Sequence, residues 1–381
     1  MPDLSADKVL AALRTAGFDF VTGVPCSYLT PLIDAVIGSR DMRYVPAANE
    51  GDAIAIAAGA EIAGRPSIVM FQNSGLGNAV NPLTSLTYTF RLPVLVLTTW
   101  RGEPGGAHDE PQHDLMGAIT PTMLESMQVP WELFPTDPNA LAAALQRARA
   151  HMQKEGRPYA LILQKGTIQA IGGDLPRTPE RVVHARVDGA FTADQRLDPD
   201  AALQVLVDAS GGQDVIVTTT GYCGRALYAL GDRENHFYMV GSMGCASSFA
   251  LGIAIARPDR RVIVADGDGA LLMRLSALAT IGVECPNNLV HVLLDNGVHD
   301  STGAQATVSP AVDLAMVAAA CGYPCAIRAT DATALRTAID GARGQLAFVH
   351  VRTNPRRQGA LPRPKETPPE IAARLRKLLR R

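Results

Sequence analysis

The chain alternates short apolar runs with longer stretches of helical periodicity. In the first half the apolar runs have the length of strands, at residues 18–25, 43–49, 66–73, 93–100, 131–136 and 159–164. Amphipathic or small-residue stretches separate them, such as 6–17 and 139–156. Strands that alternate with helices are typical of parallel α/β sheets. We therefore predict an α/β domain with about six parallel strands.

The second half repeats this pattern. Further apolar runs occupy residues 214–221, 236–241, 261–269, 289–297, 325–330 and 347–353. Between the halves, residues 173–199 are polar, contain proline and show little periodicity, which is typical of a linker. We predict a first domain over residues 1–172 and a second over residues 200–381, with no third domain between them.

Most of these strands end in polar or glycine-rich segments. In the first half they read GVPCS, NEGD, QNSGLGN and TTWRGE, and in the second half TTGYCG, VGSMG, DGDG and LDNGVHD. Ligands of open parallel sheets bind beyond the carboxyl ends of the strands. The segments therefore indicate one composite site to which both sheets contribute.

The segment Asp266-Gly267-Asp268-Gly269 carries the most specific chemistry. It joins a predicted buried strand to a helix expected from Leu271, so Asp268 can face a ligand whose phosphates lie at the helix N-terminus. The next strand ends in Asp295-Asn296 and is expected beside it. A carboxylate with an amide oxygen suits Mg²⁺. A plain glycine turn capped by aspartate is the alternative, although it accounts for only one of these side chains.

Composition excludes several other functions. With 381 residues, 47% of them hydrophobic, and a net charge of −2, the chain has no overall field to attract nucleic acid or anionic membrane. The basic stretch 374–381 is interpreted as a terminal helix whose cations complement its dipole. No apolar leader or run of eighteen apolar residues appears, so we expect a cytoplasmic protein that does not enter a membrane.

Other ion- and phosphate-binding motifs are missing. The DGDG segment is not an EF-hand, because no glutamate stands at position 12 of such a loop. No G-x-x-x-x-G-K-[ST] sequence occurs. The six cysteines include one close pair, Cys321 and Cys325, but no second cysteine pair or nearby histidine would complete a zinc site. We therefore expect reduced thiols.

The sequence resembles the thiamine diphosphate-dependent enzymes, whose motif is usually GDG followed by NN. Gly267-Asp268-Gly269 matches the first part, and Asp295-Asn296 keeps only the second asparagine. The resemblance implies thiamine diphosphate and Mg²⁺ as cofactors, with Asp268, Asn296 and the backbone carbonyl of Val298 as metal ligands. It further implies that the cofactor is lined by Thr220, Gly221, Gly267, Gly269 and Ala270.

Two further segments match this family. Glu50 follows a predicted strand and begins an alanine-rich helix, where the family has the glutamate that binds and activates the aminopyrimidine ring. Met243 stands where the family wedges an apolar side chain between the two cofactor rings, and the Gly241 carbonyl is the implied partner of the amino group. Taken alone, Glu50 could simply complement a helix dipole, and Met243 could be core packing.

The compact layout resembles the phosphonopyruvate decarboxylases and, next to them, the sulfopyruvate decarboxylases. The segments GVPCSYLTPLI, HDEPQHDLMG and LDNGVHDSTGAQ carry this likeness, which covers residues 4–353. The implied reaction is decarboxylation of 3-phosphonopyruvate, a small anionic 2-oxoacid, to phosphonoacetaldehyde and CO₂. A sulfopyruvate decarboxylase or a carboligase remains open. A non-catalytic relative would have no need to keep Glu50.

Five residues are candidates for the substrate side of the site. His113 is expected to be the catalytic acid and base, because imidazole titrates near neutrality, although it could be a solvated loop residue. Ser27 either contacts the substrate or caps the following helix. Asn73, Arg101 and His299 are further expected substrate contacts, with Arg101 as the cation for the anionic group.

The family resemblance also implies self-association. It pairs the first domain of one chain with the second domain of its neighbour, which places each active site at a subunit interface. We therefore expect a dimer or tetramer, with the large apolar helices predicted at residues 78–90 and 245–256 buried in the interface.

Overall fold

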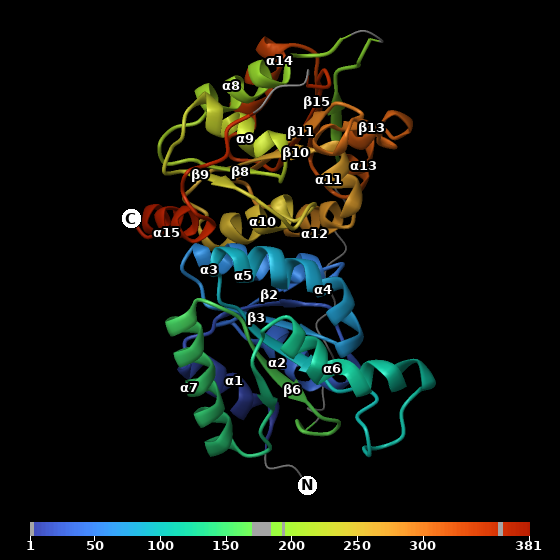
Figure 1. The fold of residues 1–381 in the computed structure, drawn as a ribbon, viewed down its shortest axis with the longest axis vertical. Coiled ribbons are helices and arrows are strands. Elements are labelled where there is room, and N and C mark those ends of the chain that lie inside the picture. Colours follow the sequence, from blue (N-terminus) through green and yellow to red (C-terminus); the bar gives the residue numbers. More distant parts are fainter. Residues whose placement is uncertain (1–3, 170–183, 193–194, 357–360) are drawn as a thin grey trace. The chain divides into compact units, whose positions relative to one another are not determined.

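The computed structural model describes residues 4–169, 184–192, 195–356 and 361–381 of the chain. The chain divides into two compact units, residues 1–180 and 181–381. Each unit is built around its own parallel sheet, as Figure 1 shows. The predicted α/β class with two parallel-sheet domains is confirmed, and the described residues form no third compact unit.

The sheet of the first unit has six parallel strands in the order β2-β1-β3-β4-β6-β5. They are β1 (Phe20–Gly23), β2 (Arg43–Pro46), β3 (Ser67–Phe71), β4 (Leu95–Thr99), β5 (Trp131–Leu133) and β6 (Tyr159–Leu163). All six lie in the predicted runs. The central strands β3 and β4 are buried at every position, because helices cover both faces of the sheet. This explains why their sequences are continuously apolar.

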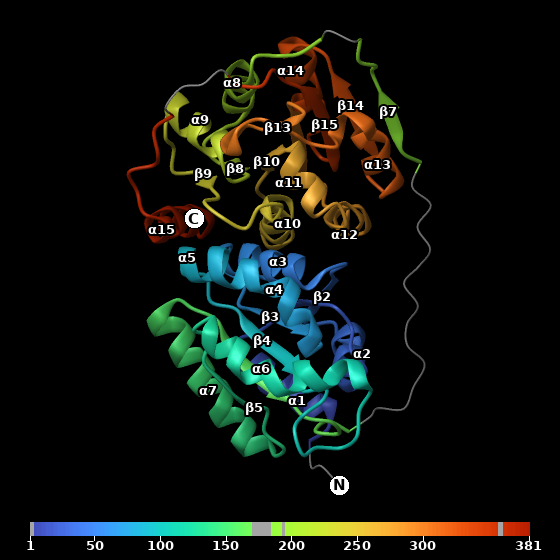
Figure 2. The ribbon, with the colours of Figure 1, turned by 45° about the vertical axis from the view of Figure 1, so that its right-hand side comes forward.

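Seven α-helices of this unit are described. They are α1 (Ala6–Thr15), α2 (Thr30–Gly38), α3 (Glu50–Ile62), α4 (Leu76–Pro82), α5 (Tyr88–Phe90), α6 (Asp114–Ser126) and α7 (Pro138–Glu155). Helices α1, α2 and α7 share one hydrophobic core with the sheet, and α3, α4 and α5 lie on the opposite side in Figures 1 and 2. The side chains of Ser5, Asn49 and Asp137 accept backbone N–H groups at the starts of α1, α3 and α7.

The sheet of the second unit has seven strands in the order β7-β14-β15-β11-β10-β8-β9. They are β7 (Arg186–Asp188), β8 (Val215–Thr218), β9 (His236–Tyr238), β10 (Val262–Gly267), β11 (Leu289–Asp295), β14 (Cys325–Ala329) and β15 (Ala347–Arg352). A separate two-stranded ribbon joins β12 (Val298–His299) to β13 (Gln305–Ala306). The six predicted runs all contain strands of the large sheet.

Strand β7 was not predicted. Its three residues fall within the segment predicted as a linker, yet they pair in parallel with β14. Three residues with a single apolar side chain carry too little pattern to indicate a strand without the neighbour that pairs with them. Residues 173–183 and 193–194 of the predicted linker lie outside the described residues, and the domain boundaries stay a prediction.

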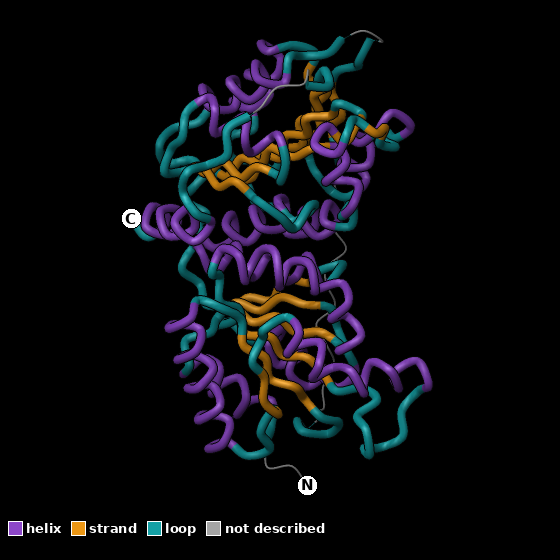
Figure 3. The backbone as a smooth tube through the Cα atoms, in the orientation of Figure 1, coloured by secondary structure: helices purple, strands orange, loops and turns teal. Residues whose placement is uncertain are grey.

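The helices of the second unit also cover both faces of its sheet. They are α8 (Pro199–Ala209), α9 (Tyr222–Leu230), α10 (Ala246–Ala256), α11 (Asp268–Met273), α12 (Ala277–Glu284), α13 (Leu314–Ala320), α14 (Ala332–Gly341) and α15 (Pro368–Leu379). Figures 2 and 3 show α10 and α12 on one side of the sheet and α8, α9 and α14 on the other. Among the described residues, no helix is long and apolar enough to cross a membrane.

Two helix predictions need comment. The helix expected from Leu271 begins earlier, at Asp268, and is interrupted between Met273 and Ala277. The segment 78–90 is helical throughout, but its middle, Leu83–Thr87, follows Pro82 as a π-helix.

We predict that Gly23→Ala destabilises the first unit. A Cβ atom at Gly23, at the end of β1, would lie 1.9 Å from the carbonyl oxygen of Met70 on β3. Because both atoms belong to paired strands, the substitution should lower the free energy of unfolding by about 1–3 kcal/mol. Gly38→Ala is the control, since a Cβ atom at Gly38 would have no other atom within 4 Å among the described residues.

The two tryptophans, Trp100 and Trp131, both lie in the first unit, so their fluorescence in a urea titration reports on its unfolding. Equal midpoints for both variants would contradict the close approach of β1 and β3.

Candidate active site

Four predicted site residues meet at one edge of the first sheet. Strands β2, β1, β3 and β4 are neighbours and run parallel, so their carboxyl ends lie side by side. Glu50, Ser27, Asn73 and Arg101 follow these four strands in that order. The fold therefore gathers residues that are up to 74 positions apart in the sequence.

Glu50 is held in a defined position at the start of α3. Asn78 donates a hydrogen bond from its amide nitrogen to Oε2 of Glu50, at 2.8 Å. A Cβ atom at Gly75 would lie 2.5 Å from Oε1, so only glycine leaves room for this carboxylate. Glu50 is half-buried. An acidic residue that only complemented the helix dipole would need neither contact.

Asp109 organises the loop after β4 and was missed by the sequence analysis. Arg101 donates to both of its carboxylate oxygens, with Nε 2.6 Å from Oδ2. The backbone N–H groups of Gly102 and Glu110 and the hydroxyl of Tyr28 also donate to Asp109. The hydrogen bond from Arg101 holds the pKa of Asp109 well below its usual range. The only sequence signal was the high density of ionisable residues in this loop.

Ser27 and Arg101 are neighbours, as two substrate candidates should be. The Oγ atom of Ser27 accepts a hydrogen bond from Nη1 of Arg101 at 3.4 Å. Neither the short 3-10 helix Ser27–Leu29 nor α2 receives a hydrogen bond from a capping side chain. The alternative that Ser27 caps this helix is therefore wrong.

Asn73 is fully buried and holds the backbone of Arg101. Its amide nitrogen donates to the Arg101 carbonyl and to Oγ1 of Thr120, both at 2.9 Å. Its amide oxygen accepts the N–H of Arg101 at 3.2 Å. Because both N–H groups of the side chain are used, Asn73 would act on a substrate mainly through the placement of Arg101.

His113 is buried, at 6% exposure, so the alternative of a solvated loop residue is wrong. Its Nδ1 atom is buried and has no hydrogen-bond partner among the described residues. A Cβ atom at Gly102 would lie 2.1 Å from the His113 carbonyl oxygen. Only glycine lets the two arms of this loop approach so closely, with φ of +69° at Gly102.

The second unit has a pocket at the carboxyl edge of its own sheet. Most lining residues lie at the ends of β8, β9, β10, β11 and β15 or in the segments that follow them. They include Thr219, Thr220, Gly221, Met243, Gly267, Asp268, Gly269, Ala270, Asn296, Val298, His299, Asp300, Thr353 and Arg356. The structure thus brings the predicted cofactor and metal residues of this unit together. Gly241 does not line the pocket but begins the turn that carries Met243.

Asp268 is a buried carboxylate at the first position of α11. Burial raises its pKa, and the nearby charge of Asp295 raises it further, while a hydrogen bond from the Thr307 hydroxyl partly offsets both. A divalent cation beside Asp268 would stabilise the anionic form. The site therefore suits a metal ion electrostatically.

Asn296 folds the neighbouring turn. Its amide oxygen accepts the N–H of Val298 at 3.0 Å, and its amide nitrogen donates to Asp300 at 2.7 Å. Gly297 has φ of +75°, which glycine adopts without strain. No group of three or more His, Cys, Asp or Glu side chains that could hold a metal occurs in the described part of the chain. A metal here would thus need amide and backbone oxygens, which suits Mg²⁺.

Met243 and His299 both lie close to Gly269. A Cβ atom at Gly269 would lie 3.4 Å from the Met243 methyl carbon and 2.5 Å from Cε1 of His299. The turn that carries Met243 is tight, with φ of +53° at Ser242 and +88° at Gly244. Met243 is partly exposed in the pocket, which core packing alone does not explain.

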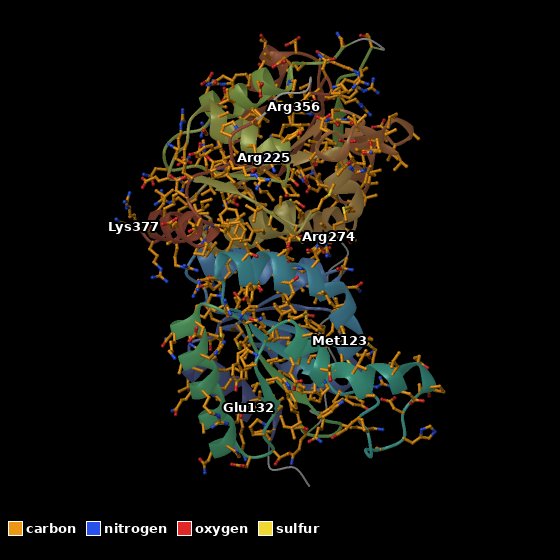
Figure 4. All side chains as sticks on the ribbon, in the orientation of Figure 1. Met123, Glu132, Arg225, Arg274, Arg356 and Lys377 are labelled. Atoms are coloured by element: carbon orange, nitrogen blue, oxygen red, sulfur yellow. The ribbon has the colours of Figure 1, made fainter. Side chains whose placement is uncertain are left out.

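Arg356 is a pocket residue that the sequence did not indicate. Its backbone N–H donates to Asp300 at 3.2 Å, and its guanidinium donates to Asp200 at 2.6 Å. Figure 4 labels Arg356 in the second unit. No motif surrounds it in the sequence, and it reaches the pocket only because β15 lies next to β11.

Comparison with known proteins agrees with this arrangement. Residues 5–119 match the family "Thiamine pyrophosphate enzyme, N-terminal TPP binding domain", and residues 220–351 match "Thiamine pyrophosphate enzyme, C-terminal TPP binding domain". The chain is 45% identical over 379 residues to a phosphonopyruvate decarboxylase of Streptomyces hygroscopicus, covering 98% of this chain and 93% of that protein.

Two more distant similarities were found. A sulfopyruvate decarboxylase of Methanosarcina acetivorans is 31% identical and covers 98% of this chain and 97% of its own length. The crystal structure of a benzoylformate decarboxylase from Polynucleobacter necessarius superposes with a TM-score of 0.75 at 15% identity, covering 93% of this chain and 99% of that one. The second match shows the fold alone. By its two matched domains and its full-length similarity, this chain belongs to the thiamine diphosphate-dependent enzymes, in the family of the phosphonopyruvate decarboxylases.

Proposed function

We propose that the protein decarboxylates 3-phosphonopyruvate to phosphonoacetaldehyde and CO₂ with thiamine diphosphate and Mg²⁺. The observation that carries this proposal is the 45% identity to a phosphonopyruvate decarboxylase over 98% of the chain. The identity to the sulfopyruvate decarboxylase is lower, at 31% over the same share. The residues of both sheet edges are compatible with this chemistry.

The pocket of the second unit would hold the metal and the diphosphate. Asp268, the amide oxygen of Asn296 and the carbonyl of Val298 would bind Mg²⁺, because it prefers oxygen ligands. Thr220, Gly221, Gly267, Gly269 and Ala270 would line the cofactor, and the glycines leave space for phosphate oxygens. Met243 would support the cofactor rings, with the Gly241 carbonyl accepting from the amino group.

The first unit would supply the activating and substrate-binding groups. When bound, the cofactor provides a nucleophilic carbon and an electron sink for the loss of CO₂. Glu50 would exchange a proton with the aminopyrimidine, held in place by Asn78. His113 would transfer a proton to and from the substrate.

Arg101 and Ser27 would contact the anionic end of the substrate. Because Arg101 donates two hydrogen bonds to Asp109, much of its positive charge is already compensated. It would orient the substrate through its remaining N–H groups rather than by charge alone. His299, near Gly269 in the second unit, would be a further contact.

The test is a steady-state assay of phosphonopyruvate and sulfopyruvate side by side, with Mg²⁺ and thiamine diphosphate and with aldehyde formation as the readout. We expect a clearly higher kcat/KM for phosphonopyruvate. The reverse order would assign sulfopyruvate as the substrate. A condensation product formed in the presence of a second aldehyde would indicate a carboligase.

We predict that Glu50→Gln separates cofactor binding from activation. The amide keeps the shape of the side chain, so thiamine diphosphate should still bind, but turnover should fall by about 10²–10⁴-fold because the acid–base group is lost. Proton exchange at C2 of the bound cofactor, followed by NMR in deuterated water, measures activation directly. Glu61→Gln, at the other end of α3, is the control and should exchange normally. Wild-type exchange in Glu50→Gln would refute the role of Glu50.

We further propose that each active site is shared by two chains, as a dimer or tetramer. The predicted consequence is complementation between Glu50→Gln and Asp268→Ala. A mixed dimer holds one site in which both residues are intact, so subunit exchange should restore up to about a quarter of the wild-type activity in an equal mixture with two sites per dimer. Mixed dimers that demonstrably form from folded parents and remain inactive would place the site within a single chain.

A further inference from the structure

Two buried aspartate–histidine pairs lie beneath the turns that line the pocket of the second unit. Asp266 on β10 accepts a hydrogen bond from Nε2 of His291 on β11, at 3.2 Å. Asp295 on β11 accepts one from Nε2 of His350 on β15, at 2.9 Å. All four side chains are almost fully buried.

The two pairs have the same place in the sheet. Asp266 is opposite Leu293, and His291 precedes Leu293 by two residues. Asp295 is opposite Arg352, and His350 precedes Arg352 by two residues. Side chains two residues apart on a strand share a face, so each pair is a diagonal contact on one face of the sheet. Since His350 is opposite Leu293, both pairs lie on the same face.

Each aspartate also binds the turn that follows it. The N–H of Gly267 donates to Oδ1 of Asp266 at 2.9 Å, and the N–H of Gly297 donates to Oδ1 of Asp295 at 3.1 Å. Gly267 directly precedes Asp268, and Gly297 separates Asn296 from Val298. One oxygen of each carboxylate therefore fixes a turn of the proposed metal site, while the other binds a histidine.

Other side chains pack against the two histidines and restrict their rings. Nδ1 of His291 lies 3.2 Å from the hydroxyl of Tyr323, and the ring of Phe348 packs edge-on against it, with centroids 5.2 Å apart. The ring of Phe191 packs edge-on against His350 at 4.9 Å. These contacts leave the imidazoles little freedom to turn away from their aspartates.

We propose that His291 and His350 are positioning residues that preorganise the two turns for Mg²⁺ and the diphosphate, an inference that rests on the proposed function. Without its histidine, a buried carboxylate loses a hydrogen bond that fixes its orientation, and the turn bound to its other oxygen is no longer fixed. This role also accounts for Asp295, where the family motif usually has asparagine. A carboxylate can accept from His350, Ser309 and Gly297 together.

The experiment measures Mg²⁺ binding to the full-length protein by calorimetry at saturating thiamine diphosphate, without substrate. His350→Leu should raise the apparent Kd for Mg²⁺ by about 10–100-fold, because the turn that presents Asn296 and Val298 to the metal is no longer fixed through Asp295. His350→Gln should stay within about threefold of wild type, because its side-chain amide can donate from near the position of Nε2.

The control is His236→Leu. His236 is buried on β9 in the same sheet, and its ring lies 3.2 Å from the Tyr238 hydroxyl. Among the described residues, its ring makes no hydrogen bond to either turn. A general loss of packing should lower the Tm of both leucine variants, but only His350→Leu should lose Mg²⁺ affinity. Wild-type affinity in folded His350→Leu, or an equal loss in His236→Leu, would overturn the inference.

A second pair of variants keeps the inference testable if His350→Leu does not fold. Asp295→Asn should weaken Mg²⁺ binding, because its amide N–H group faces the donor of His350. Adding His350→Gln should restore affinity, because glutamine can turn its oxygen towards that amide. Failure of this rescue in a folded double variant would overturn the inference.

Wild-type turnover of phosphonopyruvate is measured separately. If the His350 variants show the expected Mg²⁺ affinities but the wild type does not turn over phosphonopyruvate, the proposed substrate is wrong and the inference about His350 stands. Normal turnover with no loss of Mg²⁺ affinity in His350→Leu would reject the inference alone.

Discussion

Two buried carboxylates at the ends of adjacent strands are the constraint around which the second unit is arranged. Asp268 directly follows β10, and Asp295 is the last residue of β11. The charge of Asp295 helps to raise the pKa of Asp268. The pKa of Asp295, in contrast, is lowered. Burial alone would raise its pKa, but hydrogen bonds from His350 and Ser309 lower it. One carboxylate is thus satisfied by protein donors, and the other is left suited to a cation.

The first unit uses a carboxylate differently. The carboxylate of Asp109 is fully engaged by protein donors, namely Arg101, Tyr28 and two backbone N–H groups. It fixes a glycine-rich loop that has little regular structure of its own. The buried amide of Asn73 holds the same loop from below, through the backbone of Arg101. Arg101, which could contact a substrate, is therefore positioned by Asn73 and Asp109, which would not contact it themselves.

Membership of the family and the geometry of the pocket answer different questions. The similarity over the full length assigns the chain to the phosphonopyruvate decarboxylases. It does not say why the motif reads Asp295-Asn296 instead of two asparagines. The structure supplies a physical reason, because His350, Ser309 and Gly297 all donate to the Asp295 carboxylate. A neutral amide has one acceptor oxygen and could not replace both carboxylate oxygens.

The sequence by itself determined most strands of the two large sheets, the two-domain class and the turns that carry Glu50 and Asp268, because buried parallel strands and glycine turns have strong local patterns. Only the tertiary structure decided which residues and strands, distant in sequence, pair with one another. Arg356 and strand β7 have no local signal, since each depends on a residue far away in the chain. The diagonal pairs of aspartate and histidine were equally hidden. Strand order and register brought them together, and neither can be read from the periodicity of one strand.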